Sequence, residues 1–316
     1  MTNWLTKIRT FSTISVLIIF AFFDSCKNKP ESIFVTIPFK IIKNQMVIKV
    51  VTNESDTSNF IFDIPNENAH LDTVFAHKMG IMPYSELRVR CSNGERILPI
   101  SKSLFGINNL QLFTDTVILT SLQYASKILG IKINGIIGRD IFKNRIMKID
   151  FVNNTIKIFN LNAEPDNKGY QVFSSSRGTA IIAESTLQNG IVLWGKYILD
   201  SGSNIDLTLS PIQMDSTIIK QYIGNYKISY LKDACGSRKK AYDGKISSLK
   251  IGKTVIDSPN TLISTTDKGV LAHNDYIGFI GLPVLQYFDI IIDDIHSKIY
   301  LKVNKRYKTV RHRSVF

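Results

Sequence analysis

The chain has 316 residues and a formal net charge of +13 at pH 7; 44% of the residues are hydrophobic and 21% are charged. This composition is that of a soluble globular protein, and the length allows two domains with a core each. The basic residues are scattered, and their densest clusters, 238–240 and 302–313, lack the interleaved aromatic residues of a base-stacking platform, which argues against nucleic acid as a partner.

Residues 1–25 have the pattern of a secretory signal peptide. Lys7 and Arg9 precede an apolar run over 11–23, which is shorter than the roughly 20 residues of a membrane-spanning helix. Cys26 follows the small residue Ser25, which resembles a bacterial lipoprotein signal, in which this cysteine is lipidated and becomes the new N-terminus. We therefore expect an exported protein that is anchored in the cell envelope (periplasm or outer membrane) through Cys26. Ordinary cleavage nearby and an uncleaved anchor are the alternatives.

Short, punctuated apolar runs follow the signal and predict an all-β core. Three of these runs are 46–51, 180–183 and 290–292. A polar segment over 162–169 is typical of a linker between two domains. We expect an N-terminal half over 26–165, a C-terminal half over 166–306 and a basic tail over 307–316.

The two halves contain an internal repeat. The segment that begins at Gly135–Gly138 aligns without a gap to the one that begins at Gly278–Gly281, at an offset of 143 residues. Each copy predicts a buried strand ending in Gly, a short helical turn and two strands joined by a polar turn. Upstream, residues 60–63 match residues 197–200 at an offset of 137, so each half has an acid at a strand end: Asp63 and Asp200.

This arrangement resembles the aspartic peptidases, specifically bacterial retropepsin-like proteins with two lobes fused in one chain. The C-terminal half has Asp200-Ser201-Gly202 and an apolar-apolar-Gly strand ending at Gly281; the N-terminal half keeps Gly138 but reads Asp63-Ile64-Pro65. The resemblance covers roughly residues 33–303. It implies an all-β, bilobal acid-protease (retropepsin-like) fold, in which two homologous β-barrel-like lobes flank a central cleft.

The resemblance also implies a catalytic pair, Asp63 and Asp200, that shares one proton and one water, with Ser201, Gly202, Gly138 and Gly281 supporting the two turns. Ile64 lacks the hydroxyl that ties the turns together in this family, and Pro65 lacks an N–H. Two functions stay open: an exported aspartic endopeptidase with impaired activity, or a catalytically dead relative that binds peptide or protein in the same cleft. A structural envelope lipoprotein is a more distant third.

No metal or cofactor is expected, because the five histidines show no metal-ligand spacing. A peptide or protein substrate is the expected partner, and a monomer is favoured because both lobes lie in one chain. Residues 71–81 predict the helix that follows the first motif in this family, with Asp72 as its cap and His70 and His77 on one helix face. Cys91 and Cys235 lie in the family's flap regions (around 91–96 and 234–237) and either form a disulfide or remain two free thiols.

Overall fold

The computed structural model describes residues 33–91, 94–175, 179–211, 216–233, 235–236, 238–266, 268–272 and 275–307. The expected signal peptide, Cys26 and residues 308–316 of the tail lie outside this part. Within it, none of the helices combines the length and the apolar character that crossing a membrane requires.

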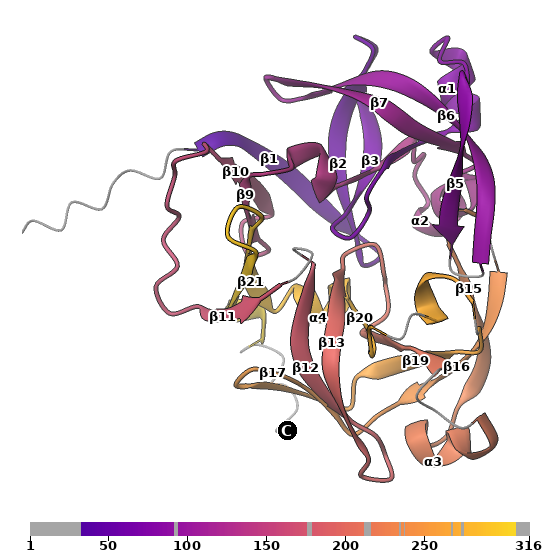
Figure 1. Ribbon diagram of the computed structural model, residues 1–316, viewed down its shortest axis with the longest axis vertical. Coiled ribbons are helices and arrows are strands. Elements are labelled where there is room, and N and C mark those ends of the chain that lie inside the picture. Colours follow the sequence, from indigo (N-terminus) through magenta and orange to yellow (C-terminus); the bar gives the residue numbers. More distant parts are fainter. Residues whose placement is uncertain are drawn as a thin grey trace, which may run out of the picture. The chain divides into compact units, whose positions relative to one another are not determined.

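Two large sheets contain most of the described chain, as the expected all-β class requires (Figure 1). The first has thirteen strands in the spatial order β11 (Gln171–Ser174), β22 (Lys298–Val303), β21 (Phe288–Asp293), β9 (Ile146–Asp150), β10 (Thr155–Phe159), β1 (Ile33–Ile42), β2 (Gln45–Thr52), β3 (Ser58–Asp63), β8 (Gly135–Gly138), β4 (Ala69–Asp72), β7 (Leu110–Thr120), β6 (Gly94–Ile107) and β5 (Ser85–Cys91). The second has nine, in the order β15 (Lys227–Lys232), β16 (Arg238–Lys245), β19 (Asn260–Ser264), β14 (Leu207–Leu209), β20 (Gly278–Gly281), β13 (Val192–Asp200), β12 (Ala180–Thr186), β17 (Ser248–Ile251) and β18 (Thr254–Asp257).

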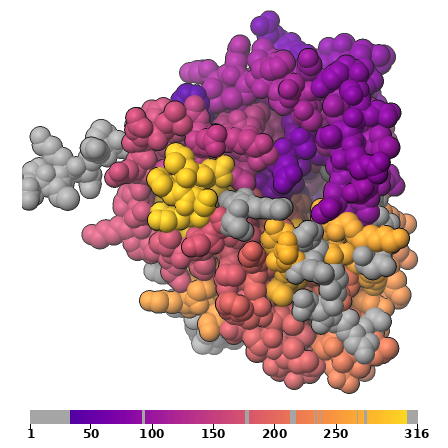
Figure 2. Space-filling model, in the orientation of Figure 1, coloured from indigo at the N-terminus to yellow at the C-terminus, as the bar shows by residue number. Residues whose placement is uncertain are grey.

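Helices are short and lie between strands. They are α1 (Thr73–Lys78), α2 (Gln123–Leu129), α3 (Ile219–Ile223) and α4 (Leu282–Leu285), with 3-10 turns at η1 (Arg139–Phe142), η3 (Ser216–Ile218) and η4 (Val270–Ala272). The three predicted strands fall in β2, β12 and β21, and the predicted linker lies between β10 and β11. In Figure 2 the colours of β2 to β7 gather on one side of the visible face, and those of β12 to β16 on the other.

Buried apolar side chains from both halves form one continuous cluster. Phe62 and Ile149 of the N-terminal half and Leu199 and Ile292 of the C-terminal half all belong to it, and each is almost fully buried. Burying an apolar side chain of this size stabilises a fold by about 1.5–3 kcal/mol relative to leaving it in water. The core therefore stabilises both halves together.

The repeat in the sequence is a repeat in the structure. Strand β3 pairs in parallel with β8, so that Asp63 lies opposite Gly138, and β13 pairs in parallel with β20, so that Asp200 lies opposite Gly281. A helical turn follows each glycine, η1 in one half and α4 in the other, and a hairpin follows each turn, β9–β10 and β21–β22. Each acid therefore stands at the end of a central strand, beside a glycine of the neighbouring strand.

Strands β9 and β21 join the two halves in a symmetric way. They pair antiparallel, with Lys148 opposite Ile291, and these two residues are separated by the 143-residue offset of the repeat. On either side, Ile149 pairs with Ile290 and Met147 with Ile292, so exchanging the halves maps this pairing onto itself. A local twofold relation between the hairpins therefore passes through the Lys148–Ile291 pair.

The segment after the first acid differs from the prediction. Residues 69–72 form strand β4, which pairs with β7 and β8, and the helix α1 begins only at Thr73. His70 therefore lies in a strand and His77 in the helix, so the prediction that they share one helix face is wrong. Pairing on both sides of β4 outweighs the helical pattern of the sequence. The predicted cap is confirmed, since Asp72 Oδ1 accepts a hydrogen bond from Phe75 N at 3.1 Å.

Candidate active site

The two strand-end acids lead into equivalent turns. After Asp63, the N–H of Asn66 donates to the Asp63 carbonyl at 3.1 Å; after Asp200, the N–H of Ser203 donates to the Asp200 carbonyl at 3.3 Å. Asn66 and Ser203 are related by the 137-residue offset of the acids. The same i to i+3 hydrogen bond therefore closes both turns, although their sequences differ.

Gly138 and Gly281 let each turn approach the neighbouring strand closely. A Cβ atom at Gly138 would lie 1.9 Å from the carbonyl oxygen of Asn66, and one at Gly281 would lie 1.8 Å from that of Ile205. Any side chain would push the turn away, so glycine is required at both positions. Both glycines thereby support the turns that carry the acids.

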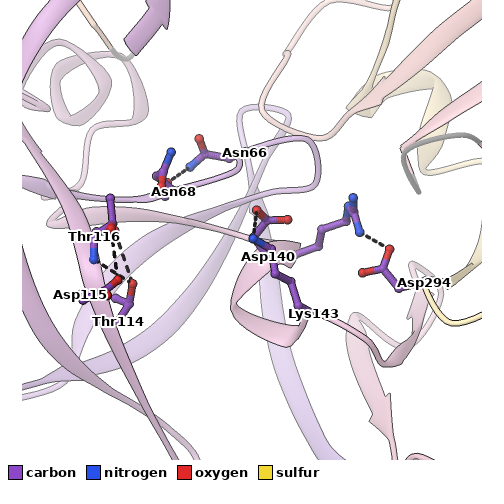
Figure 3. Close-up of polar contacts among 9 residues, drawn as sticks. Asn66, Asn68, Thr114, Asp115, Thr116, Asp140, Lys143 and Asp294 are labelled. Atoms are coloured by element: carbon purple, nitrogen blue, oxygen red, sulfur yellow. Dashed lines mark hydrogen bonds and ion pairs between the residues drawn. The ribbon is translucent and has the colours of Figure 1, made fainter. Parts of the chain in front are cut away.

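Polar contacts hold the surroundings of the first turn (Figure 3). The Asn66 side chain donates to the Asn68 carbonyl at 2.7 Å, and Asp140 forms an ion pair with Lys143 at 3.2 Å. Arg139, which directly follows Gly138, forms a largely buried ion pair with Asp294 of the C-terminal half. The turn carrying Asp63 is therefore fixed both within its own half and beside the other half.

Ser201 ties the two turns together. Its hydroxyl donates to the carbonyl of Phe62 at 3.0 Å and accepts from the N–H of Ile64 at 2.8 Å, and the residue is fully buried. These are contacts between residues more than 130 positions apart, on either side of the first acid. Ser201 therefore sets the position of Asp63 relative to Asp200.

The carboxyl groups of Asp63 and Asp200 converge on one backbone N–H. The N–H of Gly202 lies 3.0 Å from Asp63 Oδ1 and 3.0 Å from Asp200 Oδ1. The two carboxyl groups are close enough for each to act on the pKa of the other. Such a pair shares one proton more readily than it ionises twice. The structure thus brings both predicted acids together, along with Ser201, Gly202, Gly138 and Gly281.

The contacts around the two acids are unequal. Asp200 Oδ1 accepts a hydrogen bond from the N–H of Gly202 in its own turn, and the N–H of Ser203 donates to the Asp200 carbonyl. Asp63 accepts the Gly202 N–H from the opposite half, while its own turn has Pro65 at the position equivalent to Gly202. Ile64, at the position equivalent to Ser201, is fully buried and has no hydroxyl to repeat the tie in the other direction.

This inequality separates the pKa values of the two acids. Both residues are partly exposed, but protein atoms surround their carboxyl groups. Burial raises the pKa of Asp200 to about 6, against the lowering effect of the Gly202 and Ser203 N–H groups and of the hydrogen bond with Asp63. Burial, followed by the Asp200 charge, raises the pKa of Asp63 well above the usual range. Asp200 therefore ionises first, and Asp63 keeps the shared proton.

A disulfide joins the hairpins that were expected to be flaps. Cys91, at the end of β5, is bonded to Cys235, between β15 and β16, with their Cα atoms 6.0 Å apart. Arg96 of β6 donates to the Cys235 carbonyl at 2.9 Å. Of the two alternatives for these cysteines, the structure shows the pairing. The link joins the two halves near β5 and β15, away from the β9–β21 pairing (Figure 1).

Gln45 was not singled out from the sequence, and His70 was expected on a helix face. The side-chain amide of Gln45 donates to the Gly202 carbonyl at 2.6 Å. His70 is buried, and burial lowers its pKa to about 4, with Asp233 of the other half acting against this shift. The carboxylate of Asp233 lies within 4.8 Å of both disulfide sulfurs, which are bonded to each other and so are not free to bind a metal.

Comparison of the chain with protein-family models and with curated proteins finds no match in either set.

Proposed function

We propose that the protein is an aspartic endopeptidase-like hydrolase with a bilobal acid-protease fold, in which residues 26–165 and 166–306 form the lobes. The observation that carries this proposal is the pair of carboxyl groups, Asp63 and Asp200, whose Oδ1 atoms share the Gly202 N–H at 3.0 Å each. A buried carboxyl pair that holds one proton supplies both a base and an acid for attack by water on a peptide bond.

The reaction that fits this pair begins with ionised Asp200 and protonated Asp63. Asp200 removes a proton from a water molecule as the water oxygen attacks the peptide carbonyl carbon, and Asp63 gives its proton to the carbonyl oxygen. When the resulting tetrahedral diol collapses, the C–N bond breaks, Asp200 passes its proton to the leaving nitrogen, and Asp63 recovers a proton from a diol hydroxyl. The pair then returns to its starting protonation state.

The symmetry of the strands supports the bilobal fold. The Asp63–Gly138 and Asp200–Gly281 pairings are equivalent under the sequence offsets, and the β9–β21 pairing maps onto itself when the halves are exchanged. A fold of two related lobes is the arrangement that gives one acid from each half at a common centre. The proposed substrate is an extended segment of peptide or protein lying between the lobes.

The sequence supports the proposed location, and the presence of both acids in one chain supports a monomer. The signal over residues 1–25 and Cys26 support an exported lipoprotein of the bacterial envelope. Because one chain supplies both acids, the site is complete in a monomer.

The departures at Ile64 and Pro65 favour a second candidate, a protein that binds peptide or protein without cleaving it. Losing a hydrogen bond to a charged group costs about 1.5–3 kcal/mol, and each 1.4 kcal/mol in an activation barrier is a factor of about ten in rate. The missing Pro65 N–H and Ile64 hydroxyl could therefore slow hydrolysis by orders of magnitude while leaving a binding site between the lobes.

Hydrolysis of an unfolded protein between pH 3 and 8 separates the two candidates. We expect cleavage by the mature wild-type chain and none by Asp200→Asn or Asp63→Asn. Asp257→Asn is the matched control, because Asp257 also ends a strand, β18, but is exposed. Cleavage that persists unchanged in Asp200→Asn would remove the pair from the mechanism. Tight peptide binding with no turnover by the wild-type chain would favour the binding protein.

A further inference from the structure

Gln45 is placed firmly at the start of β2. The β1–β2 hairpin closes through the pair Ile42–Gln45, with Lys43 and Asn44 as the two turn residues. Both turn residues have positive φ, 46° and 59°, as a two-residue type I′ turn requires, and asparagine tolerates this conformation well. The turn and the strand together fix the backbone from which the Gln45 side chain extends.

The Gln45 side chain reaches across to the turn that carries Asp200. Its Nε2 donates to the Gly202 carbonyl at 2.6 Å, a partly buried contact between residues 157 positions apart. That carbonyl belongs to the Gly202–Ser203 peptide, and the N–H of the same peptide donates to the Asp200 carbonyl at 3.3 Å, which closes the turn. The contact therefore acts on a peptide group whose other side closes the turn that carries an acid of the pair.

Gly202 carries the backbone donor that the two acids share. Its own N–H serves the carboxyl groups of both Asp63 and Asp200, and glycine has the least restricted backbone of all residues. A Cβ atom at this position would lie 2.6 Å from Asp63 Oδ1, so a more restricted residue does not fit. A contact from another part of the chain can instead fix the orientation of the Gly202 backbone. The Gln45 side chain makes such a contact.

We propose that Gln45 is a positioning residue, whose amide holds the Gly202–Ser203 peptide so that the neighbouring Gly202 N–H stays on the two acids. This inference rests on the proposed function for its kinetic consequence, but the hydrogen bonds that it concerns exist independently of hydrolysis. The Gln45 side chain also links the N-terminal half to the opposite turn through a hydrogen bond. Ile64, at the position equivalent to Ser201, has no hydroxyl to make such a link.

Two substitutions of Gln45 remove the donor in different ways. Gln45→Met keeps the length of the side chain without an N–H, and Gln45→Glu can donate only while its carboxyl group is protonated. We expect Gln45→Met to lower kcat about tenfold with little change in KM, the effect of one lost positioning hydrogen bond. We expect the kcat of Gln45→Glu, relative to that of the wild type, to fall as the pH rises and the introduced carboxyl group ionises.

NMR titration of 13C-labelled aspartate carboxyl groups in the full mature chain gives a readout that needs no hydrolysis. With the Gly202 N–H less well placed, the carboxylates lose stabilisation, so the apparent pKa values of the Asp63–Asp200 pair should rise in Gln45→Met. Gln188→Ala is the matched control, because the Gln188 amide also donates to a backbone carbonyl, that of Lys245, at 3.1 Å. This control should leave the titration unchanged.

The outcomes are distinct. Titration and kcat equal to those of the wild type in a folded Gln45→Met protein would overturn the positioning role while leaving the proposed hydrolysis standing. Shifted carboxyl pKa values in a chain that does not cleave peptides would support the positioning role and contradict the hydrolysis. If Gln45→Met does not fold, a Gln45→Glu protein that titrates like the wild type at all pH values would overturn the inference.

Discussion

Pro65 occupies, in the turn after Asp63, the position that Gly202 occupies in the turn after Asp200. Only Gly202 has an N–H at this point, and that single group serves both carboxyl groups. The C-terminal half therefore supplies the backbone donor for both carboxyl groups. This inequality separates the pKa values of the two acids.

Restoring the missing groups should raise activity. In Ile64→Ser with Pro65→Gly, the new N–H and hydroxyl repeat the contacts that Gly202 and Ser201 make in the opposite direction. We expect kcat to rise by about ten- to a hundredfold, since the one restored hydrogen bond to a charged group, that of the new N–H, contributes about 1.5–3 kcal/mol. Pro165→Gly, in the segment between β10 and β11, controls for the loss of a proline. An unchanged or lower kcat in the double variant would contradict this explanation.

Hydrolysis should depend on pH through Asp200. The base must be ionised, and burial raises the pKa of Asp200 to about 6, so kcat should rise as the pH increases through this value. It should fall again at higher pH, where Asp63 loses its proton. A pH profile of kcat measured on a peptide substrate tests this order. An acid limb near pH 4 would show that the two carboxyl groups are not buried as the structure has them.

The raised pKa values should also affect folding stability. Stability should fall over the pH range in which kcat rises. An acid whose pKa is raised in the folded state imposes no cost below its unfolded pKa of about 3.9, and it destabilises the fold increasingly as the pH rises from there to the folded value. Folded Asp63 keeps a proton that the unfolded chain releases, so Asp63→Asn, which does not titrate, should gain free energy of unfolding relative to the wild type at pH 7. Denaturant unfolding at pH 4 and pH 7 measures this, and the gain should be smaller at pH 4. A loss of stability at pH 7 would contradict the assignment.

Much of this site follows from the residue pattern, because the pattern is local. Two apolar residues before Asp200 and a glycine after it predict a buried strand and a tight turn, and the offset repeat locates the second copy at Asp63. The inequality of the two turns also follows from the side chains of Ile64 and Pro65. These features need only the alternation of strands and the chemistry of single residues.

Other features depend on contacts over long distances in the chain. The Cys91–Cys235 pairing needs the two hairpins to meet, and the Gln45–Gly202 contact needs a particular packing of β2 on the opposite turn. The sequence around Cys91 does not identify Cys235 as its partner, and the sequence around Gln45 does not identify Gly202. The strand β4 is similar, since pairing with β7 and β8 places His70 in a strand and not on the predicted helix face.

The disulfide should stabilise the fold across the two halves. It closes a segment of 144 residues, and loss of a native disulfide typically costs about 2–5 kcal/mol, chiefly through the greater freedom of the unfolded chain. Cys91→Ser with Cys235→Ser should lower the free energy of unfolding by an amount in this range, measured with denaturant. A reducing agent should destabilise the wild type in the same way and leave the double variant unaffected. Equal stability of both proteins would contradict a bridge in the folded protein.

Ser201→Ala should affect both stability and the acid pair. It leaves the Phe62 carbonyl and the Ile64 N–H without their buried partner, which costs about 1–3 kcal/mol. Ser101→Ala is a matched control, since the buried Ser101 hydroxyl donates to the Met82 carbonyl within one half. Both variants should lose stability, but only Ser201→Ala should change the titration of Asp63 and Asp200. An equal titration in the two variants would show that Ser201 does not align the pair.

The most direct test of the shared proton is the titration of the Asp63 and Asp200 carboxyl groups in the mature wild-type chain, followed by NMR and assigned with Asp63→Asn and Asp200→Asn. As the pH rises through about 6, Asp200 should ionise while Asp63 keeps its proton, and removing either acid should shift the pKa of the other. Two carboxyl groups that ionise independently near pH 4 would contradict a coupled pair and, with it, the proposed mechanism.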